Sequence, residues 1–290
     1  MSSAGEVTPK PLPFMYQFAS GAIAGVSEIL VMYPLDVVKT RQQLDMTNAY
    51  KGTINCLKKI VKEEGFSRLY KGISAPILME APKRATKFAA NDEWGKVYRN
   101  FFGVSTMNQS LATLTGATAG ATESFVVVPF ELVKIKLQDK TSRFNGMGEV
   151  VKDIIKNNGV FGLYKGLEST LWRHIMWNAG YFGLIFQVRS LMPKPKKASE
   201  KTMIDLTCGT IGGTFGTALN TPFDVVKSRI QAGSTKYIWT WPSLFMVARE
   251  EGVAALYKGF IPKVLRLGPG GGILLVVFTA CMDFFRTIHG

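Results

Sequence analysis

Apolar residues in this chain gather in long runs that alternate with short amphipathic, basic stretches. The first run, from Phe14 to about Gln43, is followed by an amphipathic segment at 56–64 and a second long run at 73–102. The same order returns twice, with short helices predicted at 147–157 and 240–250 and second long helices at 167–191 and 260–288. Runs this long exceed ordinary strands, so the pattern predicts an all-α chain with six long helices and three short ones.

Three units of similar sequence organise the chain. Each unit carries a proline, an acid two residues later and a base three residues after that: Pro34, Asp36, Lys39; Pro129, Glu131, Lys134; Pro222, Asp224, Lys227. About thirty residues later follows an acid-Gly pair and then Tyr-Lys-Gly, at 64–72, 158–166 and 251–259, with Asn158 in place of the acid. Two linked motifs repeated together predict three repeats within one structural domain, at 14–104, 105–200 and 201–290, behind a polar tail at 1–13.

Composition and charge placement favour a membrane protein with basic loops. Hydrophobic residues make up 47% of the chain, which still carries a formal charge of +14. Of the 35 Lys and Arg residues, 20 lie at 39–71, 134–165 and 227–258, between the apolar runs, as in loops on the negative side of a membrane. The basic linker at 193–197 would lie on the opposite side. A nucleic-acid-binding protein would be expected to show a basic face or a recognised module, and the sequence shows neither.

The second long run of the first unit is polar for a membrane helix. It holds Glu80, Lys83, Arg84 and Lys87 within about two turns, and residues 80, 84 and 87 share a face. A charge at membrane depth is costly and is tolerated where it faces a wet cavity or a partner. We therefore predict that the helices surround an aqueous cavity. Gly-xxx-Gly pairs at 21/25, 116/120 and 209/213 predict close approach between helices.

Enzyme, metal and cofactor chemistry find little support in the sequence. Cys56, Cys208 and Cys281 are isolated, which predicts neither a disulfide framework nor a zinc site. Neither His174 nor His289 belongs to a recognisable catalytic pattern, and no glycine-rich phosphate loop follows a strand. The first thirteen residues lack both the apolar core of a secretory signal and the arginines of a typical transit peptide. We expect a protein that is not an enzyme and needs no cofactor or metal.

The repeated motif has a geometric consequence near the helix axis. Proline inside a helix removes one backbone hydrogen bond, so kinks are expected at Pro34, Pro129 and Pro222. The acid and base of each motif share a helix face, so three related helices would bring three acids and three bases together, each acid pairing with the base of the next unit. A glutamine nine residues after each proline could brace these pairs: Gln43, Gln138 and Gln231. A single copy would be explained by solvated charges, whereas three copies favour a ring.

These motifs resemble the signature of the mitochondrial carrier family, and the resemblance spans essentially the whole chain. It implies six transmembrane helices with pseudo-threefold symmetry in the inner mitochondrial membrane, both termini on the intermembrane-space side, and transport by a monomer through alternating access. It also implies that Asp36, Lys39, Glu131, Lys134, Asp224 and Lys227 form a matrix-side gate. A second, cytosolic network is expected to be weak here, because its positions hold Asp92, Gly95, Phe186, Arg189, Thr279 and Met282.

The resemblance further implies inner-membrane phospholipid, mainly cardiolipin, at helix N-termini. The matching glycines are Gly52, Gly72, Gly146, Gly166 and Gly259. A helix N-terminus has free amide groups that suit a phosphate. The equivalent stretch of the third unit, at 237–239, lacks the glycine.

In this family, the residues that select the substrate are expected on the second long helix of each unit. Arg173 and His174 resemble the pair found in keto-acid and carboxylate carriers, and a guanidinium matches a carboxylate. The other candidate contacts are Arg266, Asn178, Glu80, Lys83, Arg84 and Lys87. The alternative for Arg173 is a structural pair between helices. The strings at 79–88, 172–183 and 219–231 resemble carriers of 2-oxodicarboxylates, which implies exchange of 2-oxoadipate and 2-oxoglutarate.

Three other interpretations stay open at this stage. Arginine and histidine do not measure chain length, so the substrate could be citrate, malate or another carboxylate. A soluble enzyme with a basic active site is a second alternative, and a membrane scaffold or channel without transport is a third. Three intact copies of the motif argue against a passive pore, since a pore needs no closable ring.

Overall fold

The structure, a computed structural model, describes residues 13–106, 109–193 and 198–289. All regular structure in these ranges is helical. The long helices are α1 (Phe14–Leu44), α3 (Ser74–Phe102), α4 (Gln109–Gln138), α6 (Leu167–Leu191), α7 (Ala198–Ala232) and α9 (Phe260–His289). The short helices are α2 (Thr53–Glu64), α5 (Met147–Asn158) and α8 (Thr240–Glu250).

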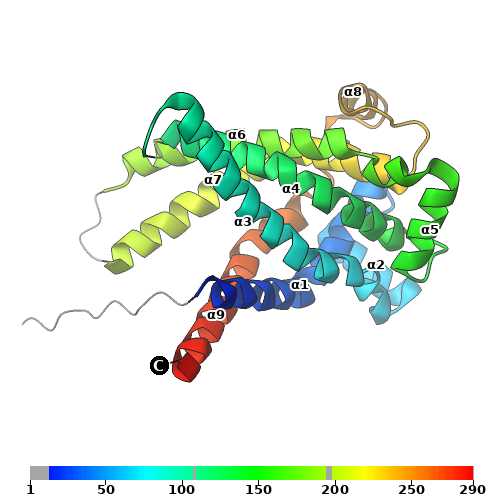
Figure 1. Ribbon diagram of the computed structural model, residues 1–290. Helices are drawn as coiled ribbons and strands as arrows, with labels where there is room; N and C mark the ends of the chain where they lie inside the picture. Colours follow the sequence, from blue (N-terminus) through cyan, green and yellow to red (C-terminus); the bar gives the residue numbers. More distant parts are fainter. Residues whose placement is uncertain (1–12, 107–108, 194–197, 290) are drawn as a thin grey trace, which may run out of the picture.

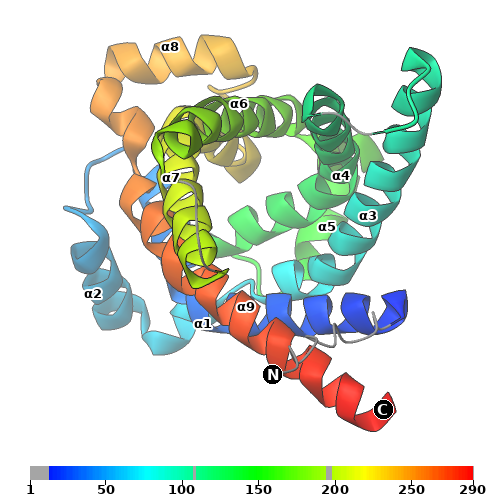
Figure 2. The same ribbon diagram turned by 90° about the vertical axis from the view of Figure 1, so that its left-hand side faces the viewer.

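The six long helices form a closed ring in the order α1, α3, α4, α6, α7 and α9 (Figure 2). The most extensive packing joins neighbouring units, at α3 with α4, α6 with α7 and α9 with α1. The short helices α2, α5 and α8 lie toward one end of the bundle (Figure 1). The start of α1 and the end of α9 lie at the other end, because each unit crosses the bundle twice.

The predicted helices agree closely with those observed. Predicted and observed bounds differ by at most three residues, and the largest difference is at the start of α2. The agreement is close because capping glycines such as Gly146 and Gly166 mark several helix starts. Sequence reasoning missed three short 3₁₀ helices, each of which ends at the tyrosine of a Tyr-Lys-Gly motif: Phe66–Tyr70, Val160–Tyr164 and Val253–Tyr257. Five residues with 3₁₀ spacing leave no periodic pattern of apolar positions to detect.

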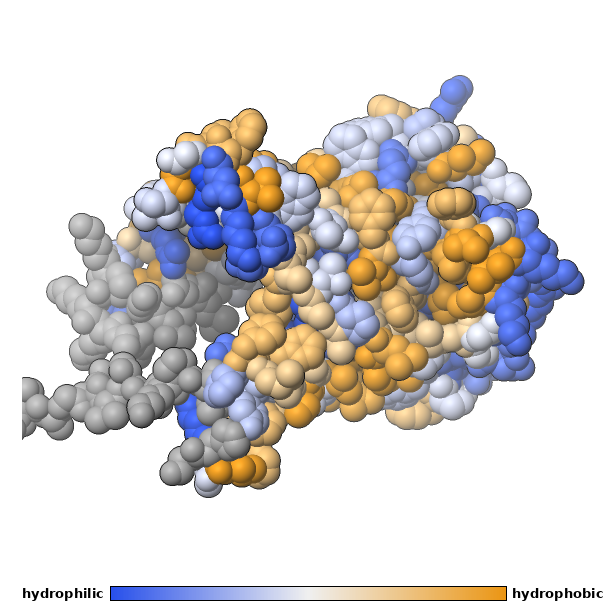
Figure 3. All heavy atoms as spheres, viewed as in Figure 1, coloured by the Kyte–Doolittle hydropathy of each residue, from blue (hydrophilic) through white to orange (hydrophobic). Residues whose placement is uncertain are grey.

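The outer surface of the long helices is apolar. Val31 is 58% exposed on α1, and Leu275 and Val276 are 64% and 69% exposed on α9. Figure 3 shows a broad hydrophobic band over the long helices and hydrophilic side chains toward the end that carries α2 and α5. Two described helical segments are long and apolar enough to cross a membrane, within Phe14–Leu44 and Val253–Ile288. Such a surface would be unfavourable in water and suits contact with lipid.

Each short helix anchors the second half of a long helix through an apolar cluster. In the first unit, Cys56 and Ile60 of α2 are fully buried against Tyr33 and Val37 of α1. The corresponding pairs from the short helices are Val150 and Ile154 in the second unit and Leu244 and Val247 in the third. Apolar residues spaced three or four apart share one face of each short helix, which is the face that packs. The segments that carry the repeated motif are therefore held firmly.

The close helix approaches fall only partly where Gly-xxx-Gly predicted them. A Cβ on Gly25 would lie 2.1 Å from the Glu80 carboxylate, so the Glu80–Arg84 pair would have to move to admit a larger residue. Among the described residues, Gly116 has no neighbour within 4 Å of its Cβ position, and neither have Gly120 and Gly209. The tight contact of α7 is instead at Gly216, whose Cβ would lie 2.8 Å from the Trp177 carbonyl oxygen. The prediction was wrong there because the motif does not show which glycine faces the neighbouring helix.

The prolines of the repeated motif lie inside continuous helices. Pro34, Pro129 and Pro222 are internal to α1, α4 and α7, and the helical assignment runs through each of them. Bending of the helices at these positions stays a prediction. Pro82 and Pro269 lie inside α3 and α9 as well.

Candidate functional site: a polar cavity next to a ring of ion pairs

The acids and bases of the repeated motif form a closed ring of ion pairs. Each pair joins one unit to the next: Lys134 Nζ to Asp36 Oδ2 at 2.8 Å, Lys227 Nζ to Glu131 Oε2 at 2.5 Å and Lys39 Nζ to Asp224 Oδ2 at 2.7 Å. This is the pairing that the shared helix face predicts for three related helices. The ring ties the three units together near the end that carries the short helices.

Every acid of the ring also contacts a cation from the second long helix of a unit. The contacts are Arg266 Nη1 to Asp36 Oδ1 at 2.5 Å, Arg173 Nη2 to Glu131 Oε1 at 3.4 Å and Lys263 Nζ to Asp224 Oδ2 at 3.3 Å. These cations come from α6 and α9, and two of the three were predicted substrate contacts. The structure thus places Arg173 and Arg266 at the boundary between the ring and the bundle interior.

Of the three glutamines, only Gln43 braces an ion pair. Its Nε2 donates to Asp224 Oδ2 at 3.0 Å, and its Oε1 accepts from Ser228 Oγ at 2.7 Å. Gln231 Nε2 instead reaches the Lys165 carbonyl oxygen at 3.4 Å, and no bond from Gln138 to an acid of the ring is described. The three sequence positions are equivalent, but the neighbours that decide each bond come from a different unit and are not the same.

A polar cavity of about 560 Å³ lies among α3, α4 and α6. Four predicted contacts line it: Lys87, Arg173, His174 and Asn178. Asn91, Trp177, Tyr181, Asn220 and Glu123 are also on its wall. Arg173 and Tyr181 are eight residues apart on one helix, so the lined stretch is about 12 Å long. Arg173 lies within 3.2 Å of His174 Nε2, and Asn178 donates to the His174 carbonyl oxygen.

A second cavity, of about 380 Å³, lies among α1, α7 and α9. Lys263 and Arg266 line it together with Asp36, and it shares Trp177 and Asn220 with the first cavity. Arg266 Nη2 bonds to Glu28 Oε1 at 2.8 Å, and Lys263 Nζ bonds to Asn220 Oδ1 at 2.5 Å. Two clusters of cations therefore lie on either side of Trp177 and Asn220.

Three predicted contacts on α3 are placed elsewhere. Glu80 accepts from Arg84 Nε at 2.6 Å and from Lys83 Nζ at 3.3 Å, and it is only 4% exposed. The Glu80–Arg84 pair packs against Gly21 and Gly25 of α1. Neither cavity described above is lined by Glu80, Lys83 or Arg84. Helical periodicity showed that residues 80 and 84 share a face, but not whether this face meets the cavity or a neighbouring helix.

Sequence reasoning missed several polar residues on the cavity walls. Lys263 lies one helical turn before Arg266, and this spacing was a signal for it. Glu123 is a lone acid in an apolar run six residues before Pro129, and acids at membrane depth are functional candidates. Asn220 carries no comparable signal.

A further set of ion pairs fastens the short helices. Arg41 Nη2 bonds to Glu64 Oε2 at 2.6 Å, and the Arg229 guanidinium binds both oxygens of Glu251. Burial alone would raise the pKa of Glu251, but the bonds from Arg229 hold it below its ordinary value. The second unit has Asn158 in place of the acid, and no ion pair is described for it there. This junction lacks the charge pairing of the other two.

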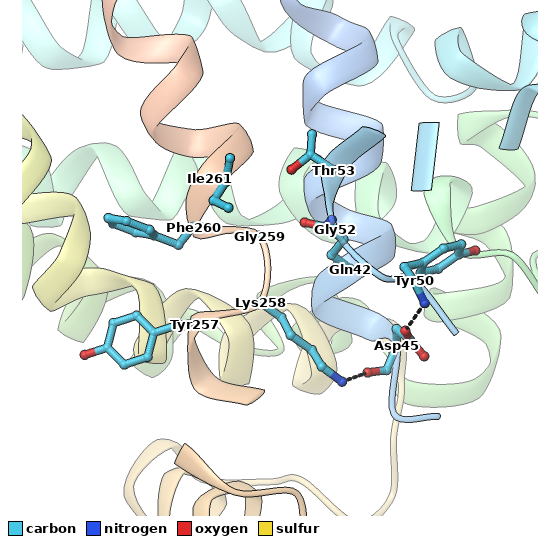
Figure 4. Close-up of a pocket in the computed structure, with 10 residues that line it drawn as sticks. All are labelled: Gln42, Asp45, Tyr50, Gly52, Thr53, Tyr257, Lys258, Gly259, Phe260 and Ile261. Atoms are coloured by element: carbon cyan, nitrogen blue, oxygen red, sulfur yellow. Dashed lines mark hydrogen bonds between the residues drawn. The ribbon is translucent and has the colours of Figure 1, made fainter. Parts of the chain in front are cut away.

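The glycines expected to bind lipid all lie at or just before helix starts. Gly52, Gly146 and Gly166 cap α2, α5 and α6, while Gly72 and Gly259 stand just before α3 and α9. A cavity of about 170 Å³ joins the start of α2 to that of α9 (Figure 4). Its wall includes Gln42, Asp45, Tyr50, Gly52, Thr53, Lys258 and Gly259.

The start of α8, where the sequence lacks the glycine, is occupied by the protein itself. The Glu168 carboxylate of α6 accepts bonds from Thr240 N at 3.1 Å and Thr240 Oγ1 at 2.7 Å. A carboxylate capping this helix start takes the place that a phosphate would occupy.

The opposite end of the bundle has no comparable ring among the residues for which contacts are described. Asp92 pairs with Lys96 at 2.7 Å, one turn further along α3, and both side chains are at least half exposed. The side chain of Phe186 lies outside the described residues. Thr279 and Met282 carry no charge.

Comparison with known proteins agrees with the three units. Residues 10–101, 106–196 and 198–289 each match the mitochondrial carrier protein family. Mitochondrial citrate transporter D of Aspergillus niger is 68% identical over 98% of both chains. Mitochondrial 2-oxodicarboxylate carrier 2 of Saccharomyces cerevisiae is 58% identical over 96% of both, and the mouse mitochondrial 2-oxodicarboxylate carrier is 41% identical over 90% of this chain and 92% of its own. The chain therefore belongs to the mitochondrial carrier family, whose members are multi-pass transporters of the inner mitochondrial membrane and not enzymes.

Proposed function

We propose that this carrier exchanges 2-oxodicarboxylates, with 2-oxoadipate and 2-oxoglutarate as the expected substrates, by alternating access. The observation that carries the proposal is the placement of Arg173. This guanidinium lines the larger cavity, lies beside His174 and reaches the ring acid Glu131 at 3.4 Å. A guanidinium fork in a partly dry site is the side chain best suited to a carboxylate.

The two cavities support a substrate with a carboxylate at each end. Arg173 and Lys87 face one cavity, Lys263 and Arg266 face the other, and the two cavities share Trp177 and Asn220 on their walls. A diacid that reached past these shared residues would place one carboxylate at each cluster. The amide of Asn178, one turn beyond His174, is available near the first cluster for a keto oxygen.

Substrate binding and gate opening would be coupled by competition for the same cations. The ring acids Asp36 and Glu131 bind Arg266 and Arg173 in the structure. Substrate carboxylates at these arginines would withdraw a cation from each ring acid. Desolvation offsets much of the Coulomb gain of a buried pair, so the ring can break and re-form between states that differ by a few kcal/mol.

Citrate is the second candidate substrate. The observation in its favour is the 68% identity to a protein named citrate transporter D, above that to the 2-oxodicarboxylate carriers compared with it. As long as it is ionised, the carboxylate of Glu123 on the cavity wall counts against a third negative charge. A dicarboxylate therefore remains the first expectation.

The lipid and orientation predictions belong to the same proposal. The starts of α2 and α9, with Lys258 between them, suit the phosphates of cardiolipin (Figure 4). The end that carries the short helices would face the matrix, with both termini on the intermembrane-space side. The bundle closes its own ring of helices, as a monomeric carrier requires.

Reconstitution into liposomes tests the substrate. Uptake of labelled 2-oxoglutarate is measured against internal 2-oxoadipate, 2-oxoglutarate, citrate, malate or ATP. We expect rapid exchange with both oxodicarboxylates. Exchange confined to citrate would establish the second candidate, and exchange confined to ATP would overturn both.

Two arginine variants test the site in the same vesicles. Arg173→Ala should reduce uptake about tenfold or more, since a charged hydrogen bond contributes about 1.5–3 kcal/mol. Arg143→Ala is the matched control, because Arg143 is exposed and pairs with Asp153 away from both cavities. Normal transport by Arg173→Ala would refute the proposed site.

A further inference from the structure

Among the described residues, Glu123 of α4 is the one carboxylate on the wall of the larger cavity. The residue is 7% exposed, and within the described part of the chain its carboxylate has no ion pair or hydrogen bond. The other acids of the bundle interior are engaged: those of the ring hold lysines, Glu28 holds Arg266, and Glu80 holds Arg84. A carboxylate this buried, without a fixed partner and facing the cavity, needs a role of its own.

The charges that face Glu123 come from three helices. They are Lys83 and Lys87 on α3, Arg173 and the neighbouring His174 on α6, and Glu131 on its own helix α4. Two of these cations already have other carboxylates, because Lys83 bonds to Glu80 at 3.3 Å and Arg173 contacts Glu131 at 3.4 Å. Lys87 lines the cavity with Glu123. The Glu123 anion is thus stabilised by shared cations rather than by a dedicated pair.

We propose that Glu123 is a proton-binding site of this carrier: the arrival of an anionic substrate draws one proton from water onto the Glu123 carboxylate, and this proton travels with the substrate. The inference rests on the proposed function, since it needs a carboxylate substrate at Arg173 and Lys87. No bond other than the O–H bond of the acid forms, and the proton comes from the aqueous solution that fills the cavity.

The physical reason is competition for positive charge. In the empty cavity Lys87 and Arg173 stabilise the anion of Glu123. A bound dicarboxylate neutralises these cations and adds two negative charges to the same space. Like charges close together in a medium less polar than water favour the neutral form of one of them. Glu123 is the group that can respond, because the substrate acids are held in place by guanidinium and ammonium groups.

The same device would widen the range of substrates. A protonated Glu123 removes the one negative charge on the wall and offers a donor in place of an acceptor. A more highly charged carboxylate could then occupy the cavity together with a proton. If Glu123 served only to lower the positive charge of the cavity, its carboxylate would stay ionised when substrate binds.

Calorimetry separates these two roles. The purified full chain in detergent is titrated with 2-oxoglutarate at pH 7 in phosphate and in Tris, which differ in ionisation enthalpy, so that the difference in heat gives the number of protons taken up. We expect about one proton per substrate for the wild type and none for Glu123→Gln with binding retained. Glu123→Asp should keep the uptake, and the exposed control Glu93→Gln should match the wild type.

Each result has a definite consequence. Substrate binding without proton uptake in the wild type would overturn the inference and leave the proposed function standing. Proton uptake that persists in Glu123→Gln would also overturn it, since another group would be responsible. If Glu123→Gln does not fold, Glu123→Asp takes its place. A proton uptake by Glu123→Asp with the same pH midpoint as the wild type would overturn the inference. A wild type that binds no 2-oxoglutarate would overturn the proposed function and this inference with it.

Discussion

The ring of ion pairs predicts that Asp224→Asn destabilises the conformation in which the ring is closed. The side chain of Asp224 is 1% exposed and has more partners than either other ring acid. Lys39 lies at 2.7 Å, Lys263 at 3.3 Å and Arg173 at 3.9 Å, and Gln43 donates to it at 3.0 Å. Asparagine keeps the shape and removes the charge, so these cations would lose their shared anion.

The magnitude follows from the burial. Removing one partner of a buried ion pair costs about 3–5 kcal/mol, because the other charge stays desolvated without compensation. One kcal/mol shifts the midpoint of thermal unfolding by about 1.6 °C in a chain of 290 residues, because the unfolding entropy is about 2.1 cal/mol/K per residue. A drop of about 5–8 °C is therefore expected. Exchanging the charges of Lys39 and Asp224 should not restore the loss, because a lysine at 224 would face Lys263 and Arg173.

The assay is thermal unfolding of the purified carrier in one detergent, with uptake measured on the same preparations. The matched control is Asp92→Asn, which removes the same charge from an exposed pair with Lys96 at the opposite end of the bundle. Water screens that pair, so no measurable shift is expected. The reasoning would be refuted if Asp224→Asn unfolded within one degree of the control.

Five further variants, one of them followed over a pH series, test other parts of the structure. Gln43→Ala should lower the unfolding free energy by about 1–3 kcal/mol, because it removes one donor to the buried Asp224 carboxylate and the acceptor of the Ser228 hydroxyl, whereas Gln138→Ala should cost less. Equal losses in denaturation would show that position in the repeat matters more than contacts. Gly25→Ala should cost about 1–3 kcal/mol by overpacking, and Gly116→Ala should leave the melting temperature nearly unchanged; the reverse order would contradict the helix contacts. The pKa of Glu251 is lower in the fold than its ordinary value of 4.5, so its arginine pair stabilises the protein above that pH and the contribution is lost as the pH falls through the folded pKa. Glu251→Gln should therefore show a shallower loss of stability on acidification than the wild type, and identical acid curves would refute the pairing.

Much of the fold followed from local sequence. The bounds of the helices agree with apolar periodicity and with glycines at their starts, such as Gly166 before α6. The pairing in the ring also followed, since acid and base three residues apart share a face and the motif occurs three times. Both inferences need only positions along one helix together with the symmetry of the repeat.

The site was predictable only in part, for a reason visible on α3. Lys87 and Glu80 are seven residues apart and share a face, yet one lines the cavity and the other packs against Gly25. A helix in a closed ring has neighbours on both sides as well as an interior, and the boundaries between these surfaces depend on how the helix is rotated. Glu123 and Lys263 were missed because their meaning depends on residues of other units.

The sequence by itself determined the repeat, the helices and the six charges of the ring, because these depend on spacing along one helix and on threefold recurrence. Tertiary structure alone decided where the three equivalent units differ. It placed Gln43 on Asp224 while Gln231 turned to a backbone carbonyl, filled the start of α8 with Glu168, and left Glu123 facing a cavity of cations. Contacts between units depend on the relative position of two helices, and no local pattern in either helix records it.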